Sequence, residues 1–208
     1  MNHNKLLEPI EAIILAAGYS SRATTFKMSL PLGQQTVLEH TLSKFAGVCN
    51  RVIVVAGYKQ NIIEAIVTDL IKKNTYSFEL KFVFNESFDQ GMFSSIQRGC
   101  QEVNAPSFFI TPGDCPLVKR KTIQLLAEEK GIIVVPSHNF KAGHPIKLTN
   151  AIKNQILKAS PDSNLREILQ NHEKTYLNVG DPGVLIDLDT SEDYKKVVEY
   201  YRRNFIVK

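Results

Sequence analysis

Short apolar segments rich in β-branched residues alternate along the chain with segments in which apolar residues recur every three or four positions. The apolar segments are continuous and bounded by turn residues, a pattern typical of strands buried on both faces of a sheet. They cover residues 11–16, 51–56, 80–84, 107–111 and 132–136. Because strands that alternate with helices form parallel sheets, we predict an α/β fold with a mostly parallel central sheet and helices on both faces.

The helix expected between the first two of these strands has a clear start signal. Thr36 is followed three positions later by Glu39, the two ends of a capping box, so we expect a helix that begins after Thr36 and runs to about Phe45. Over residues 60–73 the apolar residues fall on one helical face. Two further helices are expected over residues 92–103 and 120–130.

The last part of the chain has a less regular pattern. We predict helices over 151–159 and 164–171, strands near 175–179 and 184–188, and a final amphipathic helix over 191–204. Thr190 and Asp193 form a start signal for the final helix. No linker-like segment, repeat or low-complexity stretch divides the chain, so we expect one domain over residues 1–208.

Composition and charge restrict the function classes. Of the 208 residues, 43% are hydrophobic and 22% are charged, which is enough apolar material for a sizeable core. The net charge of +4 comes from cations spread along the chain, which argues against nucleic-acid binding and suits an anionic small molecule. The three distant cysteines lack metal or disulfide spacing, and neither a signal peptide nor a membrane-length apolar segment occurs. We therefore expect a cytoplasmic protein without membrane or nucleic-acid partners.

The first strand leads into a segment suited to binding phosphate. Leu15, Ala16, Ala17 and Gly18 would let backbone N–H groups approach a ligand closely. Arg22 and Lys27 follow them and could neutralise phosphate oxygens. The alternative is a surface turn with two solvated charges. The segment is neither a Walker A loop nor a dinucleotide-binding fingerprint, because it lacks both glycine patterns.

Carboxylates follow two other predicted strands. Asp114 lies in the turn after 107–111, and Asp187 and Asp189 end the strand near 184–188. Ligands bind at the carboxyl ends of parallel strands, and Mg²⁺ prefers carboxylate and phosphate oxygens. Residues i and i+2 of a strand share a face, so Asp187 and Asp189 would lie together. The alternatives are an Asx-type turn at Asp114 and a helix cap at Asp189.

A third polar group lies where one strand ends and a helix begins. Asn85 follows the strand at 80–84, and Ser95 lies near the start of the next helix, where hydroxyl and free N–H groups suit a ribose or phosphate. The alternative is a serine that only caps the helix. His144, in a Gly-His-Pro turn, is expected to be structural or solvated, and Cys115 is expected to be a small spacer. Serine-hydrolase and zinc motifs are absent from the sequence.

Five motifs together resemble the MobA-like nucleotidyltransferases. LAAGYSSR followed by Lys27 resembles the L-A-A-G-x-S-x-R-M-G-x-x-K signature of that family. PGDCPLV resembles its G-D-x-P-L-V, GMFSSIQRG its G-M-x-x-S-[IL]-x-x-G, GHP its G-[HN]-P, and DLDTSEDY its D-[IV]-D-T-P-E-D-[LY]. The motifs follow the family order along nearly the whole chain. Their GDxPLV, GHP and DIDTPED versions look most like the molybdenum cofactor cytidylyltransferase branch.

The resemblance implies a Rossmann-like nucleotidyltransferase fold and Mg²⁺-dependent transfer of a nucleoside monophosphate from an NTP, with release of pyrophosphate. In the cytidylyltransferase branch CTP is the donor, molybdopterin phosphate is the acceptor, and a molybdoenzyme or its chaperone is an implied partner. The matching positions here are, for the nucleotide, Leu15, Ala16, Ala17, Gly18, Asn85 and Ser95; for catalysis, Arg22, Lys27 and Asp114; and for the metal, Asp114, Asp187 and Asp189.

One position departs from the family pattern. Thr24 stands where the family has a glycine between the two cations. A β-branched residue resists positive φ, so either the loop bends differently or turnover is impaired. Three hypotheses therefore stay open: a molybdenum cofactor cytidylyltransferase, a nucleotidyltransferase for a sugar phosphate or other phosphorylated acceptor, and a non-catalytic nucleotide-binding homologue.

Overall fold

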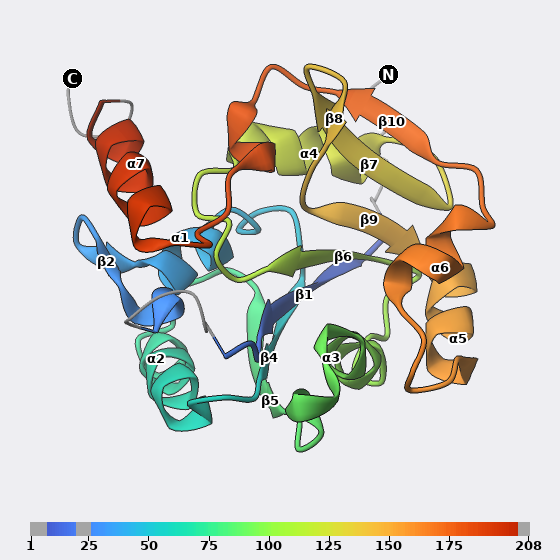
Figure 1. Cartoon of the computed structure of the whole chain (residues 1–208), viewed down its shortest axis with the longest axis horizontal. Helices are drawn as coiled ribbons and strands as arrows, with labels where there is room; N and C mark the ends of the chain where they lie inside the picture. The colour runs from blue at the N-terminus through green and yellow to red at the C-terminus, as the bar shows by residue number, and fades with distance from the viewer. Residues whose placement is uncertain (1–7, 20–25, 204–208) are drawn as a thin grey trace, which may run out of the picture.

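The computed structural model describes residues 8–19 and 26–203, and its elements follow the predicted alternation (Figure 1). The strands are β1 (Ile10–Ala16), β2 (Pro31–Leu32), β3 (Gln35–Thr36), β4 (Arg51–Ala56), β5 (Glu79–Phe84), β6 (Ser107–Pro112), β7 (Ile133–His138), β8 (Lys141–Ala142), β9 (Ile146–Thr149) and β10 (Thr175–Asn178). The α-helices are α1 (Val37–Ser43), α2 (Gln60–Lys72), α3 (Met92–Cys100), α4 (Arg120–Glu128), α5 (Asn150–Lys158), α6 (Leu165–Gln170) and α7 (Ser191–Tyr201). Short 3₁₀ helices cover Lys27–Ser29, Phe88–Gln90 and Pro182–Leu185.

The central sheet has the strand order β10-β7-β9-β6-β1-β4-β5, with β8 paired to β7. The β1–β4, β1–β6, β4–β5 and β7–β10 pairs are parallel. Only β8 and β9 run antiparallel to their neighbours in this sheet. The predicted mostly parallel sheet is confirmed. Leu15 of β1 pairs with Val55 and Pro112, so the carboxyl ends of β1, β4 and β6 lie at one edge.

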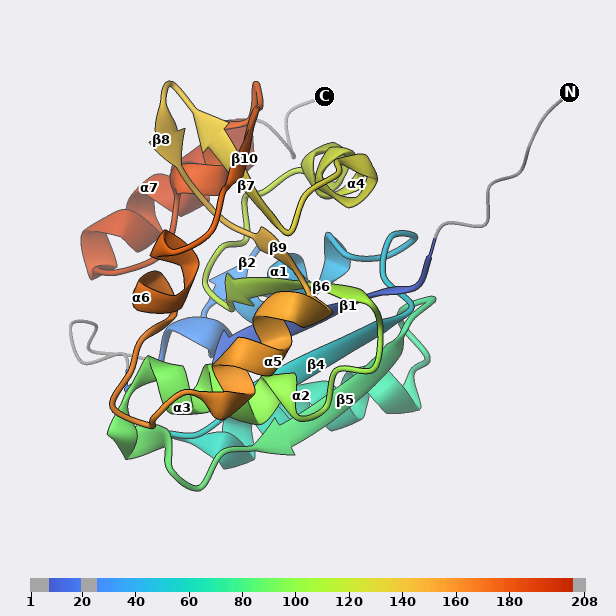
Figure 2. The same ribbon diagram turned by 90° about the vertical axis from the view of Figure 1, so that its right-hand side faces the viewer.

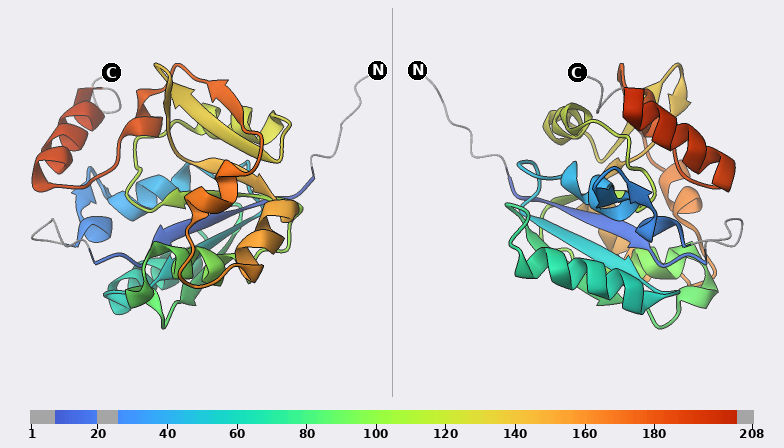
Figure 3. Two further views of the ribbon diagram at one scale, coloured as in Figure 1. Left: turned by 45° about the vertical axis from the view of Figure 1, so that its right-hand side comes forward. Right: turned by 90° about the vertical axis from the view of Figure 1, so that its left-hand side faces the viewer.

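Helices cover both faces of the sheet, as predicted. Side chains alternate along β1, so that Ala12 and Ile14 belong to one core while Ile13 and Leu15 belong to the other. The first core includes residues of α1, α2 and α4, and the second includes residues of α3, α5 and α6. Figure 1 shows the two sets on opposite sides of the sheet, and Figure 2 shows α3 and α5 in front of it. In Figure 3, α5 and α6 face the viewer in one panel and α2 in the other.

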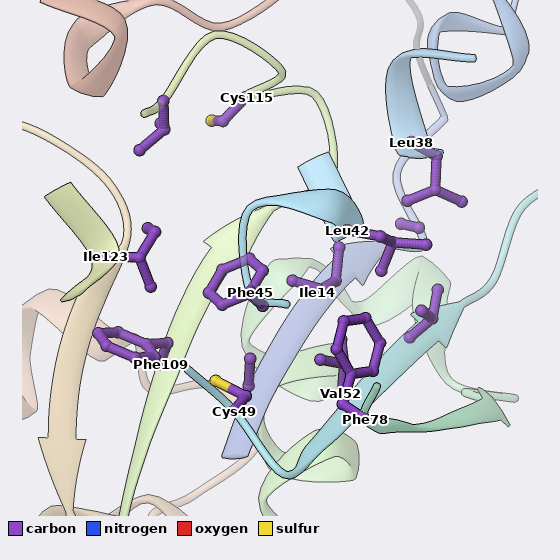
Figure 4. Close-up of a cluster of buried hydrophobic side chains, with 14 of the residues drawn as sticks. Ile14, Leu38, Leu42, Phe45, Cys49, Val52, Phe78, Phe109, Cys115 and Ile123 are labelled. Atoms are coloured by element: carbon purple, nitrogen blue, oxygen red, sulfur yellow. The ribbon is translucent and has the colours of Figure 1, made fainter. Parts of the chain in front are cut away.

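The first core fills the space between the sheet and α1 (Figure 4). The ring of Phe45, just after α1, lies 5.8 Å from the ring of Phe109 on β6. Cys49 and Cys115 are free thiols buried in the same cluster. Burial raises the pKa of the Cys115 thiol, so Cys115 is protonated and serves as a small packing residue.

Two predicted helix starts are confirmed. At α1, Thr36 Oγ1 accepts a hydrogen bond from Glu39 N at 3.3 Å, and the Glu39 carboxylate accepts one from Thr36 N at 2.6 Å. Thr190 and Asp193 form the same capping box at α7. Helix α7 packs against β2 and α1 at the periphery of the molecule (Figure 1). Within the described residues, every helix is too short or too polar to cross a membrane.

The sequence pattern does not predict β9, because Lys147 interrupts its apolar residues. Lys147 is buried, and its Nζ donates to the carbonyl oxygens of Ala127, at 3.1 Å, and of Glu129. These carbonyls lie at the end of α4, where a cation is favoured by the helix dipole. A charged residue that interrupts the apolar pattern can therefore lie in a buried strand, because carbonyl oxygens from another element accept its hydrogen bonds.

The strand predicted near 184–188 is wrong. Pro182–Leu185 form a 3₁₀ helix, and residues 186–189 have no regular secondary structure. The backbone at Gly183 packs directly on the turn after β6: a Cβ there would lie 2.3 Å from the carbonyl oxygen of Leu117. This close packing directs residues 186–189 across the end of the sheet, so that they do not extend it as a strand.

Candidate active site

A cavity of about 550 Å³ opens at the carboxyl ends of β1 and β6. Its walls come from these strand ends, from the segments that follow them, from the start of α3 and from the segment before α7. The lining residues are Leu15, Ala17, Gly18, Tyr19, Lys27, Met28, Phe88, Asp89, Gly91, Met92, Ser95, Pro112, Asp114 and Asp189. This is the edge of the sheet at which ligands bind in parallel α/β folds.

The end of β1 and the two residues that follow it contribute three of the four predicted residues to the cavity. Leu15, Ala17 and Gly18 line it, whereas the side chain of Ala16 is fully buried in the core on the α1 side of the sheet. A Cβ at Gly18 would meet no atom within 4 Å. The small side chains therefore leave the backbone open to a ligand, as predicted, but Ala16 packs away from it.

Lys27 links two carboxylates that come from distant parts of the chain. Its Nζ lies 3.1 Å from Asp189 Oδ1 and 3.8 Å from Asp114 Oδ2. Lys27 is buried in the cavity wall, and the side chain of Asp114 is only 13% exposed. Two carboxylates therefore converge on one ammonium group and bring acidic oxygen atoms together at the cavity.

Asp114 is electrostatically perturbed by its position. Burial raises its pKa to about 6; the charges of Asp187 and Asp189 add to the rise, and Lys27 opposes it. Its Oδ1 atom is buried and has no hydrogen-bond partner among the described residues. Since an unsatisfied buried carboxylate oxygen costs free energy, this atom is suited to binding a cation.

Backbone contacts hold the acidic segment 186–189 against the end of the sheet. On one side, Gly183 packs on the carbonyl oxygen of Leu117. On the other side, His144 N donates a hydrogen bond to the carbonyl oxygen of Val184 at 2.9 Å. The Gly-His-Pro turn therefore positions the segment that carries the aspartates.

The side chain of His144 is partly buried next to Asp187. Burial lowers its pKa, while the nearby charge of Asp187 partly opposes this shift. The imidazole is therefore neutral at pH 7, and its Nδ1 has no hydrogen-bond partner among the described residues. His144 does not line the cavity.

The structure separates the two aspartates of the predicted pair. Asp189 lines the main cavity, whereas Asp187 lines a second cavity of about 300 Å³ next to α7, together with Lys196 and Tyr200. The prediction that they share a strand face is wrong, because residues 186–189 are not a strand. Asp187 still acts on Asp114 through its charge.

Asn85 lies behind the cavity wall rather than in it. It is 4% exposed, and its Nδ2 donates to the hydroxyl oxygens of Ser94, at 2.9 Å, and Ser95, at 3.0 Å. Ser95 itself lines the cavity. The predicted pair is thus adjacent, but of the two only Ser95 lines the cavity.

Other features of the site were predicted in part or not at all. Arg22 and Thr24 lie outside the described residues. Phe88 and Asp89, which line the cavity, belong to a short 3₁₀ helix without a periodic sequence signal. Gly57 is the one sequence feature that is tied to the position of Phe88, because a Cβ at residue 57 would lie 2.4 Å from Cβ of Phe88.

The carboxylates fit a metal ion that is shared with a substrate. Among the described residues, no group of three or more His, Cys, Asp or Glu side chains could hold a metal. Mg²⁺ commonly uses one or two protein carboxylates together with substrate phosphates and water. Asp114, with its unpartnered oxygen, and Asp189 supply such a donor set at the cavity.

Comparison with known proteins agrees with this geometry. The model of the MobA-like NTP transferase domain matches residues 12–175. The chain is 27% identical over 199 residues to the molybdenum cofactor cytidylyltransferase of Escherichia coli K12, covering 94% of this chain and 98% of that protein. A nucleotidyl transferase from Methanothermobacter has a similar structure, with a TM-score of 0.80, 20% identity, and 94% and 98% of the two chains covered. A Mycobacterium tuberculosis protein solved as a complex with manganese gives a TM-score of 0.72 at 24% identity, with 92% and 98% covered. Because the family model spans well over half of the chain, this protein belongs to the MobA-like NTP transferase domain family and is a nucleotidyltransferase.

Proposed function

We propose that this nucleotidyltransferase transfers CMP from CTP to the molybdopterin phosphate of the molybdenum cofactor, with Mg²⁺ as cofactor and with release of pyrophosphate. The observation that carries the proposal is Lys27, whose Nζ lies between Asp114 and Asp189 in the wall of the cavity. The similarity to the E. coli molybdenum cofactor cytidylyltransferase over 94% of the chain supports the choice of donor and acceptor.

In the proposed reaction, an oxygen of the acceptor phosphate attacks the α-phosphorus of CTP. The bond between that phosphorus and the bridging oxygen breaks, and pyrophosphate leaves with the electron pair. Such transfers depend on charge neutralisation and alignment more than on covalent catalysis. Lys27 would neutralise the triphosphate, as would Arg22 by its place in the sequence motif. The acceptor phosphate is already ionised near pH 7, so no general base is assigned.

Asp114, Asp187 and Asp189 are the proposed Mg²⁺ ligands. The buried, unpartnered Oδ1 of Asp114 and the cavity position of Asp189 support the first and third. Asp187 lines the neighbouring cavity, so mutagenesis must decide whether it binds the ion. When bound, the ion would offset negative charge on the triphosphate. The manganese complex of a structural relative supports a divalent cation.

A turnover assay tests the donor and the acceptor together. The purified protein is incubated with Mg²⁺, with CTP, GTP or UTP, and with molybdenum cofactor or a sugar 1-phosphate, and pyrophosphate release is measured. We expect release with CTP and molybdenum cofactor. Release only with a sugar 1-phosphate would contradict the proposed acceptor and favour the sugar-phosphate alternative. Release only with GTP or UTP would contradict the proposed donor.

Thr24 is the observation that favours a second candidate, a nucleotide-binding homologue without turnover. The missing glycine removes a backbone conformation that phosphate loops use. This candidate predicts that the wild-type protein binds CTP without releasing pyrophosphate. It also predicts that Thr24→Gly gains activity, whereas the leading proposal predicts activity in the wild type.

Two further expectations belong to the proposal. A molybdoenzyme or its chaperone would receive the cytidylylated cofactor. The protein would work in the cytoplasm, in agreement with the free and buried state of Cys49, Cys100 and Cys115.

A further inference from the structure

The buried side-chain amide of Asn85, next to the cavity, is held in one orientation. Asn85 Oδ1 accepts a hydrogen bond from the backbone N–H of Ser87 at 3.1 Å. Because a backbone N–H can only donate, this contact decides which end of the amide is the oxygen. The nitrogen end therefore faces the serines, and its two hydrogens are donated to Ser94 Oγ and Ser95 Oγ at 2.9 and 3.0 Å.

The two serines differ in where their own protons can go. Ser94 Oγ lies 2.8 Å from the carbonyl oxygens of both Ser87 and Gly91, so its proton is donated within the protein. The hydroxyl of Ser95 has only Asn85 as a hydrogen-bond partner among the described residues, and Asn85 is the donor in that bond. Ser95 lines the cavity. Its proton is therefore left for a ligand.

We propose that Asn85 is a positioning residue that makes Ser95 a hydrogen-bond donor toward the cavity, so that the site selects a ligand with an acceptor atom at this point. The inference rests on the proposed function for the ligand class, the nucleoside part of an NTP. The acceptor is a carbonyl oxygen or unprotonated ring nitrogen of the base, or a ribose oxygen. A ligand N–H at this point could use only the second lone pair of Ser95 Oγ and would leave the hydroxyl proton of this 2% exposed residue without an acceptor.

Asn85→Asp tests the proposal because it preserves shape and reverses polarity. One carboxylate oxygen still accepts from Ser87 N, while the other now accepts from the serine hydroxyls and turns the Ser95 proton away from the cavity. We measure CTP binding by calorimetry with Mg²⁺ present. The affinity is expected to fall about three- to tenfold in both Asn85→Asp and Ser95→Ala, the loss of one neutral hydrogen bond. Ser94→Ala is the matched control: Ser94 shares the Asn85 contact but does not line the cavity, so CTP affinity stays within twofold.

Two comparisons separate polarity from the added negative charge. Tripolyphosphate has no nucleoside, so Asn85→Asp leaves its affinity unchanged if polarity is the cause and weakens it like CTP if charge is the cause. In the Ser95→Ala background, Asn85→Asp is expected to add no further loss of CTP affinity. Ribose 5-triphosphate, which lacks the base, locates the acceptor: the variants weaken its binding only if the acceptor is a ribose oxygen.

Unchanged CTP affinity in Ser95→Ala, with a wild-type melting temperature, would overturn the proposal, and this variant decides the matter if Asn85→Asp does not fold. Equal losses for CTP and tripolyphosphate in Asn85→Asp would also overturn it. Because binding is measured and not turnover, intact CTP binding without cytidylyl transfer contradicts the proposed function alone.

Discussion

Lys27 and Asp189 are 162 positions apart in the sequence, yet Nζ of Lys27 lies 3.1 Å from Oδ1 of Asp189. Lys27 is the first residue of the 3₁₀ helix Lys27–Ser29, and Asp189 belongs to the segment before α7. Their contact, together with Asp114, forms the charged wall of the cavity. The charged part of the site therefore exists only when the end of the chain is folded across the edge of the sheet.

Lys27→Ala is expected to lower kcat/KM for CTP about 10²- to 10³-fold, a loss of about 2.7–4 kcal/mol of transition-state stabilisation, as for removal of one preorganised donor. The reason is that negative charge builds up on the leaving pyrophosphate. Steady-state kinetics of pyrophosphate release measure the effect. Lys72→Ala, an exposed lysine on α2, is the matched control and should leave the rate unchanged. An increase in KM with unaltered kcat would restrict Lys27 to ground-state binding.

The cavity geometry predicts unequal roles for the three aspartates. Asp114→Ala is expected to abolish Mg²⁺-dependent turnover, because the metal ion would lose an anionic ligand. Asp189→Asn should lower turnover about tenfold more than Asp187→Asn, since of the two only Asp189 lines the main cavity. Mg²⁺ titrations of the rate provide the measurement. Equal defects in the two asparagine variants would contradict this distinction, and near-normal activity of Asp114→Ala would contradict the metal assignment.

Asp114 is expected to make the ligand-free protein less stable as the pH rises. Its folded-state pKa of about 6 is above the ordinary value of 3.8, so the folded protein binds this proton more tightly than the unfolded chain does. The contribution of Asp114 to the free energy of unfolding therefore decreases between these two pH values and stays low above them. Asp114→Asn cannot ionise and should raise the free energy of unfolding at pH 8 by roughly 1–3 kcal/mol.

Urea unfolding at pH 8 and pH 4 measures this gain, most of which should be lost at pH 4. A gain of the same size at both pH values would mean that the substitution acts through packing and not through ionisation.

Asp181 caps α4 from a distant position in the chain. Its Oδ2 accepts hydrogen bonds from Lys119 N at 2.8 Å and Thr122 Oγ1 at 2.6 Å, and the residue is 2% exposed. Asp181→Ala should lower the free energy of unfolding by about 3 kcal/mol, because buried donors lose a charged acceptor. Asn164→Ala removes an exposed local cap, which accepts from Glu167 N at 3.0 Å, and should cost about 1 kcal/mol. Chemical denaturation compares them; similar small losses would show that the distant cap is dispensable.

Much of the fold is readable in the sequence because its signals are local or periodic. Continuous apolar segments predict the buried parallel strands, and the Thr36–Glu39 and Thr190–Asp193 pairs predict two helix starts. The small residues after β1 and the aspartate after β6 likewise follow from the rule that ligands bind at strand ends. Each of these inferences needs only neighbours within a few positions.

Features that depend on contacts across the sheet were not predictable in this way. Lys147 breaks the pattern of β9, and its compatibility with a buried strand depends on carbonyl groups at the end of α4. The segment 186–189 has strand-like alternation, but Gly183 packs on Leu117 and directs it elsewhere. Alternation predicts which side chains share a face only when the segment is paired in a sheet.

The sequence by itself determined the α/β class, the order of most elements and several of the polar residues at the cavity, among them Lys27, Ser95, Asp114 and Asp189. Only the tertiary structure decided which of the predicted residues face the cavity: Ser95 and Asp189 do, whereas Asn85 and Asp187 lie beside it. The physical reason is that spacing along the chain fixes the identity and local conformation of a residue. Its partners are chosen by packing, which here brings Lys27, Asp114 and Asp189 together from three separate segments.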